Sequence, residues 1–303
     1  MIYTVTFNPA LDYTMEIDNL KIGEINRAKS EMILPGGKGI NVSTILNRLH
    51  VQNTAMGFVA GFTGQELTGQ LQKQGINTDF IELKNGQTRI NVKLEGDKET
   101  AINGNGPDIT QDDINKLILK LENLKEKDIL VLSGSIPCNI RKTIYEEICE
   151  RLQNKNIDIV VDATGDLLVN VLKYHPLLIK PNTDELSEIF NREITSNEDI
   201  AHYGKKLKDM GAKNVIVSMG NRGATLITNE GEVIYSPTPD IKIINTVGAG
   251  DSMVAGFIAG LQQYGDMKKA LKLGISAGSA TSASKYLGTE EEILKTFNNI
   301  LFE

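Results

Sequence analysis

The sequence Asn245-Thr-Val-Gly-Ala-Gly-Asp251 leads into residues 252–262, where apolar side chains recur at the spacing of a helix. Glycine allows a tight turn and lets the backbone come close to a ligand. The first amides of a helix have no partner within the helix and lie at the positive end of its dipole. A helix that begins in this way favours an anion, phosphate above all. The stretch therefore predicts a phosphate-binding turn in front of a helix.

Asp251 is the unusual member of this stretch, because a carboxylate repels phosphate. The small residues Gly248, Ala249 and Gly250 precede it and let the backbone there come close to a ligand. Two interpretations of Asp251 remain open from this stretch alone. It can be a general base that takes a proton from a hydroxyl attacking phosphorus. It can also be a helix cap, a position that aspartate favours.

Composition limits the class of protein. Of the 303 residues, 40% are hydrophobic and 23% are charged, which is typical of a globular protein with one large domain or two small ones. The formal net charge is −7, so we expect no nucleic-acid partner, and an anionic substrate must be held by a local group of basic side chains. The chain lacks an apolar run of about 18 residues, so we expect no membrane span.

Cysteine and histidine are too scarce to support two further classes of protein. Cys138 and Cys149 are the only cysteines, which are too few for a disulfide framework and fit a reducing cytoplasm. The histidines and cysteines form no cluster with the spacing of a zinc site. Residues 1–7 lack the basic region and apolar core of a signal peptide. We therefore expect a cytoplasmic protein without a zinc site.

Strand and helix patterns alternate along most of the chain. Continuous apolar runs at 129–132 and 157–161 are typical of buried parallel strands, and a helical pattern at 141–153 lies between them. This order predicts an α/β fold with a doubly wound, mostly parallel sheet and helices on both of its faces. We expect residues 1–303 to form a single domain of this kind.

Two segments, at about 12–34 and 86–104, interrupt that alternation. Both contain short stretches in which apolar and polar residues alternate, as a half-buried strand does. We expect them to pair into a small β-sheet, inserted in the α/β core, that acts as a lid. Ligands of doubly wound folds bind beyond the carboxyl ends of the parallel strands, where such a lid would close. An exposed apolar face on the lid would favour pairing with a second copy of the chain into a homodimer.

A second glycine-rich stretch is Leu34-Pro-Gly-Gly-Lys-Gly-Ile-Asn41. Gly36 and Gly37 would let the backbone approach a ligand rich in hydroxyls. Lys38 offers a positive charge for phosphate, and Asn41 offers both donor and acceptor atoms. The alternative is a plain glycine turn in front of a helix at 41–50.

Several polar residues near predicted strand ends are weaker candidates. Asp12, where the chain leaves the first strand, can accept hydrogen bonds from sugar hydroxyls or can simply belong to a turn. Arg89 and Asn91 lie two apart on one face of a strand, where an arginine suits phosphate but is also common as a solvated edge residue. Arg27 has the same two interpretations. Ser135 follows the apolar run 129–132 and suits either a substrate pocket or any connecting loop.

Two further motifs follow predicted strands. Lys180-Pro-Asn-Thr-Asp-Glu185 places Asn182 and Glu185 three residues apart, which suits shared binding of Mg²⁺ through water or, alternatively, a capping box. Ser218-Met-Gly-Asn-Arg-Gly223 suits the lining of a nucleotide pocket, with Arg222 near phosphate, or a simple β-turn.

The order of these motifs is more specific than any one of them. The Asn-Pro-Ala-Leu-Asp at 8–12, Gly-Gly-Lys-Gly-x-Asn at 36–41, Lys-Pro-Asn-x-x-Glu at 180–185 and Thr-Val-Gly-Ala-Gly-Asp at 246–251 together resemble the PfkB (ribokinase-like) carbohydrate kinases. The resemblance runs from Tyr3 to about Gly288. Within that family the chain looks most similar to bacterial kinases of fructose 1-phosphate, and tagatose-6-phosphate kinases are near neighbours.

This resemblance implies a function. It implies ATP-dependent phosphorylation of the 6-hydroxyl of fructose 1-phosphate to fructose 1,6-bisphosphate, with ATP as co-substrate and Mg²⁺ as cofactor. Asp251 would be the base, and the backbone of Gly248, Ala249 and Gly250 would form an anion hole. Asn182 and Glu185 would organise Mg²⁺ through water.

The resemblance also implies two sets of binding residues. The substrate-binding set comprises Asp12, Gly36, Gly37, Lys38, Asn41, Arg27, Arg89, Asn91 and Ser135. Within it, Lys38, Arg27 and Arg89 would hold the 1-phosphate. The ATP-binding set comprises Ser218, Met219, Gly220, Asn221, Arg222, Gly223, Gly250 and Asp251.

Other functions remain as alternatives. One is the same chemistry on tagatose 6-phosphate, and another is a kinase for an unphosphorylated sugar, which would not need three basic residues for a substrate phosphate. A dinucleotide-dependent oxidoreductase would place Gly-x-Gly-x-x-Gly after an early strand, where this chain has Asn8-Pro-Ala. A non-catalytic sugar-phosphate-binding regulator would not need Asp251.

Overall fold

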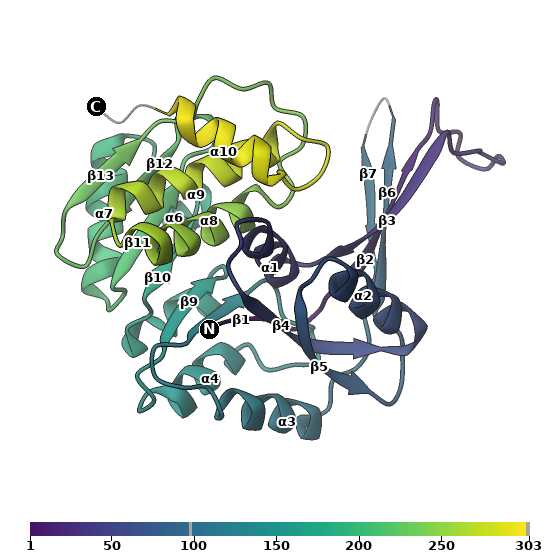
Figure 1. Ribbon diagram of the computed structural model, residues 1–303, viewed down its shortest axis with the longest axis horizontal. Helices are drawn as coiled ribbons and strands as arrows, with labels where there is room; N and C mark the ends of the chain where they lie inside the picture. Colours follow the sequence, from purple (N-terminus) through teal and green to yellow (C-terminus); the bar gives the residue numbers. More distant parts are fainter. Residues whose placement is uncertain (97–98, 301–303) are drawn as a thin grey trace.

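The computed structural model describes residues 1–96 and 99–300, and they form a layered α/β body with a smaller sheet projecting from it (Figure 1). Within these residues the main sheet has nine strands in the order β13-β12-β11-β10-β9-β8-β1-β4-β5. Neighbours are parallel except for the pairs β11–β12 and β12–β13. The strands are β1 (Ile2–Thr6), β4 (Asn53–Ala60), β5 (Asn77–Leu83), β8 (Ile129–Ser133), β9 (Asp158–Asp162), β10 (Leu178–Ile179), β11 (Asn214–Ser218), β12 (Ala224–Ile227) and β13 (Val233–Ser236).

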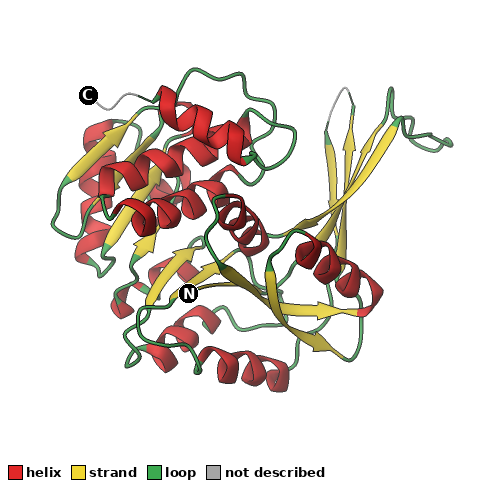
Figure 2. Cartoon of the chain, viewed as in Figure 1, coloured by secondary structure: helices red, strands yellow, loops and turns green. Residues whose placement is uncertain are grey.

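Helices cover both faces of this sheet (Figure 2). One face packs against α3 (Gln111–Leu121), α4 (Ile144–Leu152), α5 (Asp166–Val169), α6 (Thr183–Phe190) and α7 (Asn197–Asp209). The other face packs against α1 (Lys38–Arg48), α2 (Gly61–Lys73), α8 (Ala249–Tyr264), α9 (Met267–Ser282) and α10 (Glu290–Asn299). Short 3-10 turns occupy Leu172–Tyr174 and Gly220–Arg222.

The apolar runs build two cores because side chains alternate between the two faces of a strand. In β8, Leu130 and Leu132 join the first core, whereas Ile129 and Val131 join the second. All four are buried. The predicted doubly wound, mostly parallel α/β architecture with helices on both faces is therefore confirmed.

The projecting sheet corresponds to the small sheet that the sequence predicts, and we call it the lid, although its closing over a ligand stays a prediction. Among the described residues it has four strands in the order β3-β2-β6-β7, namely β2 (Ala10–Glu16), β3 (Ser30–Gly36), β6 (Arg89–Glu95) and β7 (Thr100–Asn103). The two predicted segments pair through β2 and β6, which run parallel with Asp12 opposite Asn91. The first segment is slightly longer than predicted at both ends, and residues 97–98 of the second lie outside the described part.

Two helices begin earlier than the sequence pattern indicates. The helix predicted at 252–262 starts at Ala249, after Gly248 with φ 80°, and ends at Tyr264. Asp251 therefore lies in the first turn of α8, and the interpretation of Asp251 as its cap is wrong. The helix predicted at 41–50 starts at Lys38, after Gly37 with φ 117°. In both cases the glycine before the helix adopts a backbone angle that other residues avoid, and the helix starts directly after it.

Small residues let α8 and α9 pack closely. A Cβ atom on Gly256 would lie 2.6 Å from the carbonyl oxygen of Leu273 and 2.9 Å from the Cβ of Ala277. A Cβ on Gly260 would lie 2.6 Å from the Cα of Ala270. Residues 251–260 of α8 are all buried, so this contact fixes the helix whose first turn carries Asp251. Among the described residues, no helix is both long enough and apolar enough to cross a membrane.

We predict that Gly256→Ala lowers the free energy of unfolding by about 1–3 kcal/mol, because the added methyl group overpacks the α8–α9 contact. Gly69→Ala is the matched control. Gly69 also lies within a helix, but a Cβ there would meet no atom within 4 Å. The control should gain about 0.5–1 kcal/mol from helix propensity alone. Urea denaturation of both variants checks this, and equal effects would contradict the close packing.

Candidate active site

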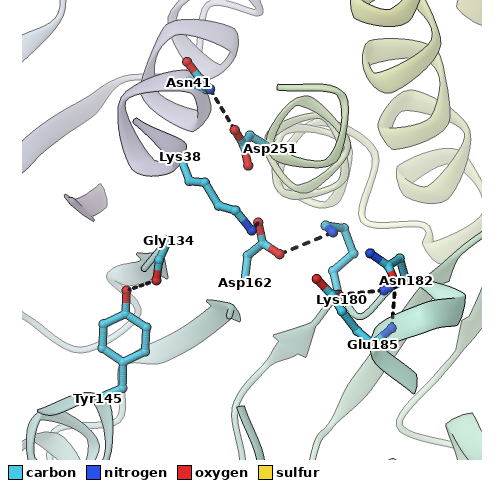
Figure 3. Close-up of polar contacts among 9 residues, drawn as sticks. All are labelled: Lys38, Asn41, Gly134, Tyr145, Asp162, Lys180, Asn182, Glu185 and Asp251. Carbon is cyan, nitrogen blue, oxygen red and sulfur yellow. Dashed lines mark hydrogen bonds and ion pairs between the residues drawn. The ribbon is translucent and has the colours of Figure 1, made fainter. Parts of the chain in front are cut away.

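The predicted phosphate site lies where α1 and α8 begin, beyond the carboxyl ends of the parallel strands (Figure 3). Asp251 projects from the first turn of α8 and is only 5% exposed. The side-chain amide of Asn41, on α1, donates a 2.7 Å hydrogen bond from Nδ2 to Oδ2 of Asp251. The two glycine-rich stretches of the sequence therefore meet at this carboxylate.

A second buried carboxylate lies next to the first and was not predicted. Asp162 is the last residue of β9, and its side chain is 3% exposed. Its Oδ2 lies 3.4 Å from Nζ of Lys38, and its Oδ1 lies 3.3 Å from Nζ of Lys180 (Figure 3). Burial alone would raise the pKa of Asp162, but the charges of Lys180 and Lys38 outweigh it and hold the pKa below its usual value.

The ammonium groups of the two lysines lie near the start of α8. A Cβ atom on Gly250 would lie 3.2 Å from Nζ of Lys180, so this ammonium packs against the glycine turn. Burial opposes the charge on Lys38, yet Asp162, Asp251 and Glu185 outweigh burial and raise the pKa of its ammonium above the usual value. A phosphoryl group placed here would meet backbone amides and two cations.

The carboxyl group of Asp251 is an unusually weak acid for an aspartate. Burial raises its pKa from 3.8 to about 7, and the negative charge of Asp162 acts in the same direction. The charges of Lys38 and Lys180 and the hydrogen bond from Asn41 oppose the rise without cancelling it. A carboxylate with a pKa near neutrality is suited to accept a proton and release it again at physiological pH.

Asp12 lies on strand β2 of the lid and borders a pocket that Asn41 also lines. Its Oδ1 accepts a 2.8 Å hydrogen bond from Nδ2 of Asn91, and its Oδ2 accepts one of 2.8 Å from Nζ of Lys93. A Cβ on Gly36 would lie 2.7 Å from the carboxyl carbon of Asp12, so a larger residue there would push this carboxyl group aside. A pocket of about 100 Å³ lies beside this carboxyl group and is lined in part by Asp12, Asn41 and Lys93.

The remaining predicted substrate residues are less closely gathered. Arg89 is half-buried, and its Nε donates a 3.1 Å hydrogen bond to the carbonyl oxygen of Asn8. Ser135 is exposed in the loop after β8, which the Tyr145 hydroxyl anchors through a 3.1 Å hydrogen bond to the carbonyl oxygen of Gly134 (Figure 3). Arg27 is exposed in the loop that joins β2 to β3, at the outer end of the lid (Figure 1).

A larger pocket of about 570 Å³ opens on the other side of the glycine turn. Its lining includes Ser218, Gly220, Asn221, Ala249 and Gly250, together with the apolar side chains of Ile241, Ile243 and Met253. An apolar pocket that ends at the start of a helix fits a ligand with a flat ring at one end and phosphates at the other.

Four members of the predicted ATP set do not belong to the lining of this pocket, namely Met219, Arg222, Gly223 and Asp251. Met219 is buried. The Arg222 guanidinium donates a 2.7 Å hydrogen bond to the carbonyl oxygen of Thr195. Gly223 has φ 101°, and a Cβ there would lie 2.1 Å from the carbonyl oxygen of Ser236, so it serves the turn between β11 and β12.

Asn182 and Glu185 form the capping box of α6. Asn182 Oδ1 accepts from the Glu185 amide at 2.8 Å, and Glu185 Oε2 accepts from the Asn182 amide at 2.9 Å. The box leaves Glu185 Oε1 outside these two bonds. In the described part of the chain no group of three or more His, Cys, Asp or Glu side chains could hold a metal by itself. This donor set fits Mg²⁺, which keeps several waters and takes one or two carboxylates together with substrate phosphates.

Sequence reasoning missed three residues that the structure places in this region. Asp162 ends an apolar strand, which is the same signal that marked Asp12, and Lys180 begins a motif whose later residues were singled out. Lys93 is two residues beyond Asn91 and therefore on the same face of β6. Each had a usable local signal, but the ion pairs that single them out link residues far apart in the sequence.

Comparison with known proteins defines the class. Residues 5–293 match the model of the pfkB family carbohydrate kinases. A protein of Bacillus subtilis (strain 168) named 1-phosphofructokinase is 46% identical over 96% of this chain and 95% of its own length. A D-tagatose-1-phosphate kinase of Bacillus licheniformis is 37% identical over 99% of this chain and 98% of its own. The crystal structure of phosphofructokinase-2 from Escherichia coli in complex with fructose-6-phosphate has a TM-score of 0.91 at 28% identity, covering 98% of each chain.

The fold, the site and these matches define a carbohydrate kinase. The chain belongs to the PfkB family, as its motifs predicted. The near neighbour among the relatives is a kinase of tagatose 1-phosphate, whereas the motifs had suggested tagatose 6-phosphate.

Proposed function

We propose that this chain transfers the terminal phosphoryl group of ATP to the 6-hydroxyl of fructose 1-phosphate and so forms fructose 1,6-bisphosphate. The observation that carries the proposal is the buried Asp251, with a pKa of about 7, in the first turn of α8 beside two lysines. The relative named 1-phosphofructokinase, at 46% identity over nearly the full chain, supports the choice of substrate. We also propose that residues 1–303 act as one kinase domain with its inserted lid.

The nucleotide would occupy the larger pocket, with its base among the apolar side chains and its phosphates at the glycine turn. The backbone of Gly248, Ala249 and Gly250 would hold the transferring phosphoryl group, and Lys180 would neutralise its charge. Asn182 and Glu185 would hold Mg²⁺ through water, and the ion would supply further neutralisation of the phosphate charge. The Ser218–Gly223 turn would border the nucleotide through Ser218, Gly220 and Asn221.

The sugar phosphate would lie between the lid and the start of α1. Asp12, Asn41 and the backbone of Gly36 and Gly37 would bind its hydroxyls. Lys38 and Arg89 would bind the 1-phosphate, with Asn91 and Ser135 at its margins. Arg27, at the outer end of the lid, is not part of this proposed set. Asp251 would take the proton from the 6-hydroxyl as that oxygen attacks phosphorus, because an ionised carboxylate at this position is the nearest base to the anion hole.

Two alternatives differ in substrate or in class. The relative named D-tagatose-1-phosphate kinase favours tagatose 1-phosphate as a second sugar substrate, and tagatose 6-phosphate is a further one. A non-catalytic regulator that binds a sugar phosphate would have no use for a buried acid with a raised pKa, because burying a carboxyl group without a role is unfavourable.

The substrate is tested most directly by a coupled assay of ADP release. Fructose 1-phosphate, tagatose 1-phosphate, tagatose 6-phosphate, fructose 6-phosphate and fructose are compared at equal concentration. We predict the highest kcat/KM for fructose 1-phosphate. A higher value for either tagatose phosphate would replace the proposed substrate, and no turnover with any of the sugars would favour the regulator.

The role of Asp251 is tested by Asp251→Asn, which keeps the shape of the side chain and removes the base. We predict a fall in kcat of about 10²- to 10⁴-fold, the usual contribution of a general base, with little change in the KM values. Asp209→Asn, an exposed aspartate at the end of α7, is the control. Near-normal turnover in Asp251→Asn would disprove the assignment.

We further propose a homodimer through the lid. Ile33, Ile90 and Phe62 line an apolar pocket of about 520 Å³ on the side of the lid opposite Asp12, and they are 44%, 40% and 69% exposed. Sedimentation velocity should give the mass of a dimer for the wild-type chain and of a monomer for Ile90→Asp. A monomeric wild-type chain at assay concentrations would rule the dimer out.

A further inference from the structure

Asp12 is held on both oxygens by neighbours on its own sheet. In the β2–β6 ladder Asp12 lies opposite Asn91, and Thr14 lies opposite Lys93. Asn91 and Lys93 are two residues apart and therefore project from the same face of the lid as Asp12. Each donates a 2.8 Å hydrogen bond, Asn91 to Oδ1 and Lys93 to Oδ2.

These contacts leave the carboxyl group a single orientation. The carboxyl group packs against the backbone of Gly36 on one side, where even a methyl group would not fit. A carboxylate can accept about four hydrogen bonds, so after Asn91 and Lys93 have bound it still has acceptor capacity on both oxygens. That remaining capacity points in fixed directions because both donors are fixed.

Lys93 and Asp12 form an ion pair at the surface of the lid. The Lys93 and Asp12 side chains are each 20% exposed, so their ion pair lies at a lid surface that water reaches. Water that reaches an ion pair screens its charges and so reduces its contribution to folding. The pair also borders the pocket that Asp12 shares with Asn41, whose amide in turn binds Asp251. The ion pair therefore matters more for ligand binding by Asp12 than for folding.

We propose that Lys93 is a positioning residue that fixes the Asp12 carboxylate so that it distinguishes the configuration of neighbouring hydroxyls on a ketohexose 1-phosphate. This inference rests on the proposed function. D-Fructose and D-tagatose differ only in configuration at C4, so their 1-phosphates present one hydroxyl on opposite sides. A fixed carboxylate accepts a hydrogen bond from the C4 hydroxyl of one epimer. With the other epimer one of its oxygens is left without a donor, and this loss of a hydrogen bond lowers the affinity for that epimer. A carboxylate free to turn would follow either hydroxyl.

The test uses the full-length chain and compares Lys93→Met with wild type. Methionine keeps the apolar stem of lysine and removes the donor. We predict that the KM for fructose 1-phosphate rises about tenfold or more, as expected for the loss of a charge-assisted hydrogen bond that orders a ligand contact. The KM for ATP and kcat at saturation should stay within about twofold, because Lys93 touches neither the nucleotide pocket nor the base. The ratio of kcat/KM between the 1-phosphates of fructose and tagatose should move toward one.

Two further variants separate positioning from a general effect. Lys93→Arg restores a cationic donor. It should recover part of the wild-type ratio of kcat/KM between the 1-phosphates of fructose and tagatose, which we call the epimer ratio. Lys116→Met removes a lysine that pairs with Asp113 at 2.7 Å on α3, away from the lid, and should match wild type in every constant. Thermal unfolding of all three checks that the folds are intact. Should Lys93→Met not fold, Lys93→Leu, which also has no donor, takes its place.

The outcomes are distinct. An unchanged epimer ratio in Lys93→Met, or equal rises in the KM for sugar and for ATP, would overturn the inference while the proposed function stands. If the wild-type chain phosphorylates neither ketohexose 1-phosphate, the proposed function fails first and the inference fails with it. A raised sugar KM together with a ratio near one, partly restored in Lys93→Arg, supports the role proposed for Lys93.

Discussion

The ion pairs that the buried Asp162 makes with Lys38 and Lys180 are the interaction on which the site depends. A buried charge is strongly unfavourable unless it is paired, so the two lysines keep Asp162 ionised at the end of β9. That fixed negative charge is one reason why the neighbouring Asp251 holds its proton to about pH 7. The lysines in turn are held in place near the start of α8. One carboxylate thus adds to the effect of burial on the acidity of the proposed base and pairs with the cations beside it.

The fold brings these groups together because of its topology. Parallel strands end at one edge of the sheet, and the helices that follow them begin there. Asp162 and Lys180 follow adjacent strands, while Asn41 and Asp251 lie near the starts of α1 and α8 on the same face. The lid adds Asp12, Asn91 and Lys93 from a second sheet. A region with a proposed base, cations and hydroxyl acceptors therefore forms where two sheets and two helix starts converge.

Local patterns were sufficient for much of this arrangement. Apolar runs gave the strands, the interrupted alternation gave the lid, and the glycine turns located the starts of α1 and α8 to within a few residues. The pattern did not give the first residue of each helix, because the positive φ of Gly37 and Gly248 lets the helix begin directly after the turn. The sequence pattern also does not show which way a side chain points. Arg222 lies in a glycine-containing turn, where a phosphate ligand was expected, yet its guanidinium contacts the carbonyl of Thr195. Asp162 has partners 124 and 18 residues away along the chain.

The most direct measurement is the pH dependence of kcat/KM in the wild-type chain and in Asp162→Asn. A base must be ionised to act, so wild-type activity should rise with pH along a limb with an apparent pKa of about 7. Removing the charge of Asp162 lowers the pKa of Asp251, so this limb should move to lower pH in the variant. The position of the limb does not depend on how much rate is lost because Lys38 and Lys180 have lost their partner. The phosphate of the sugar also titrates, near pH 6, but equally for both proteins. A limb at the same pH in both would contradict the account.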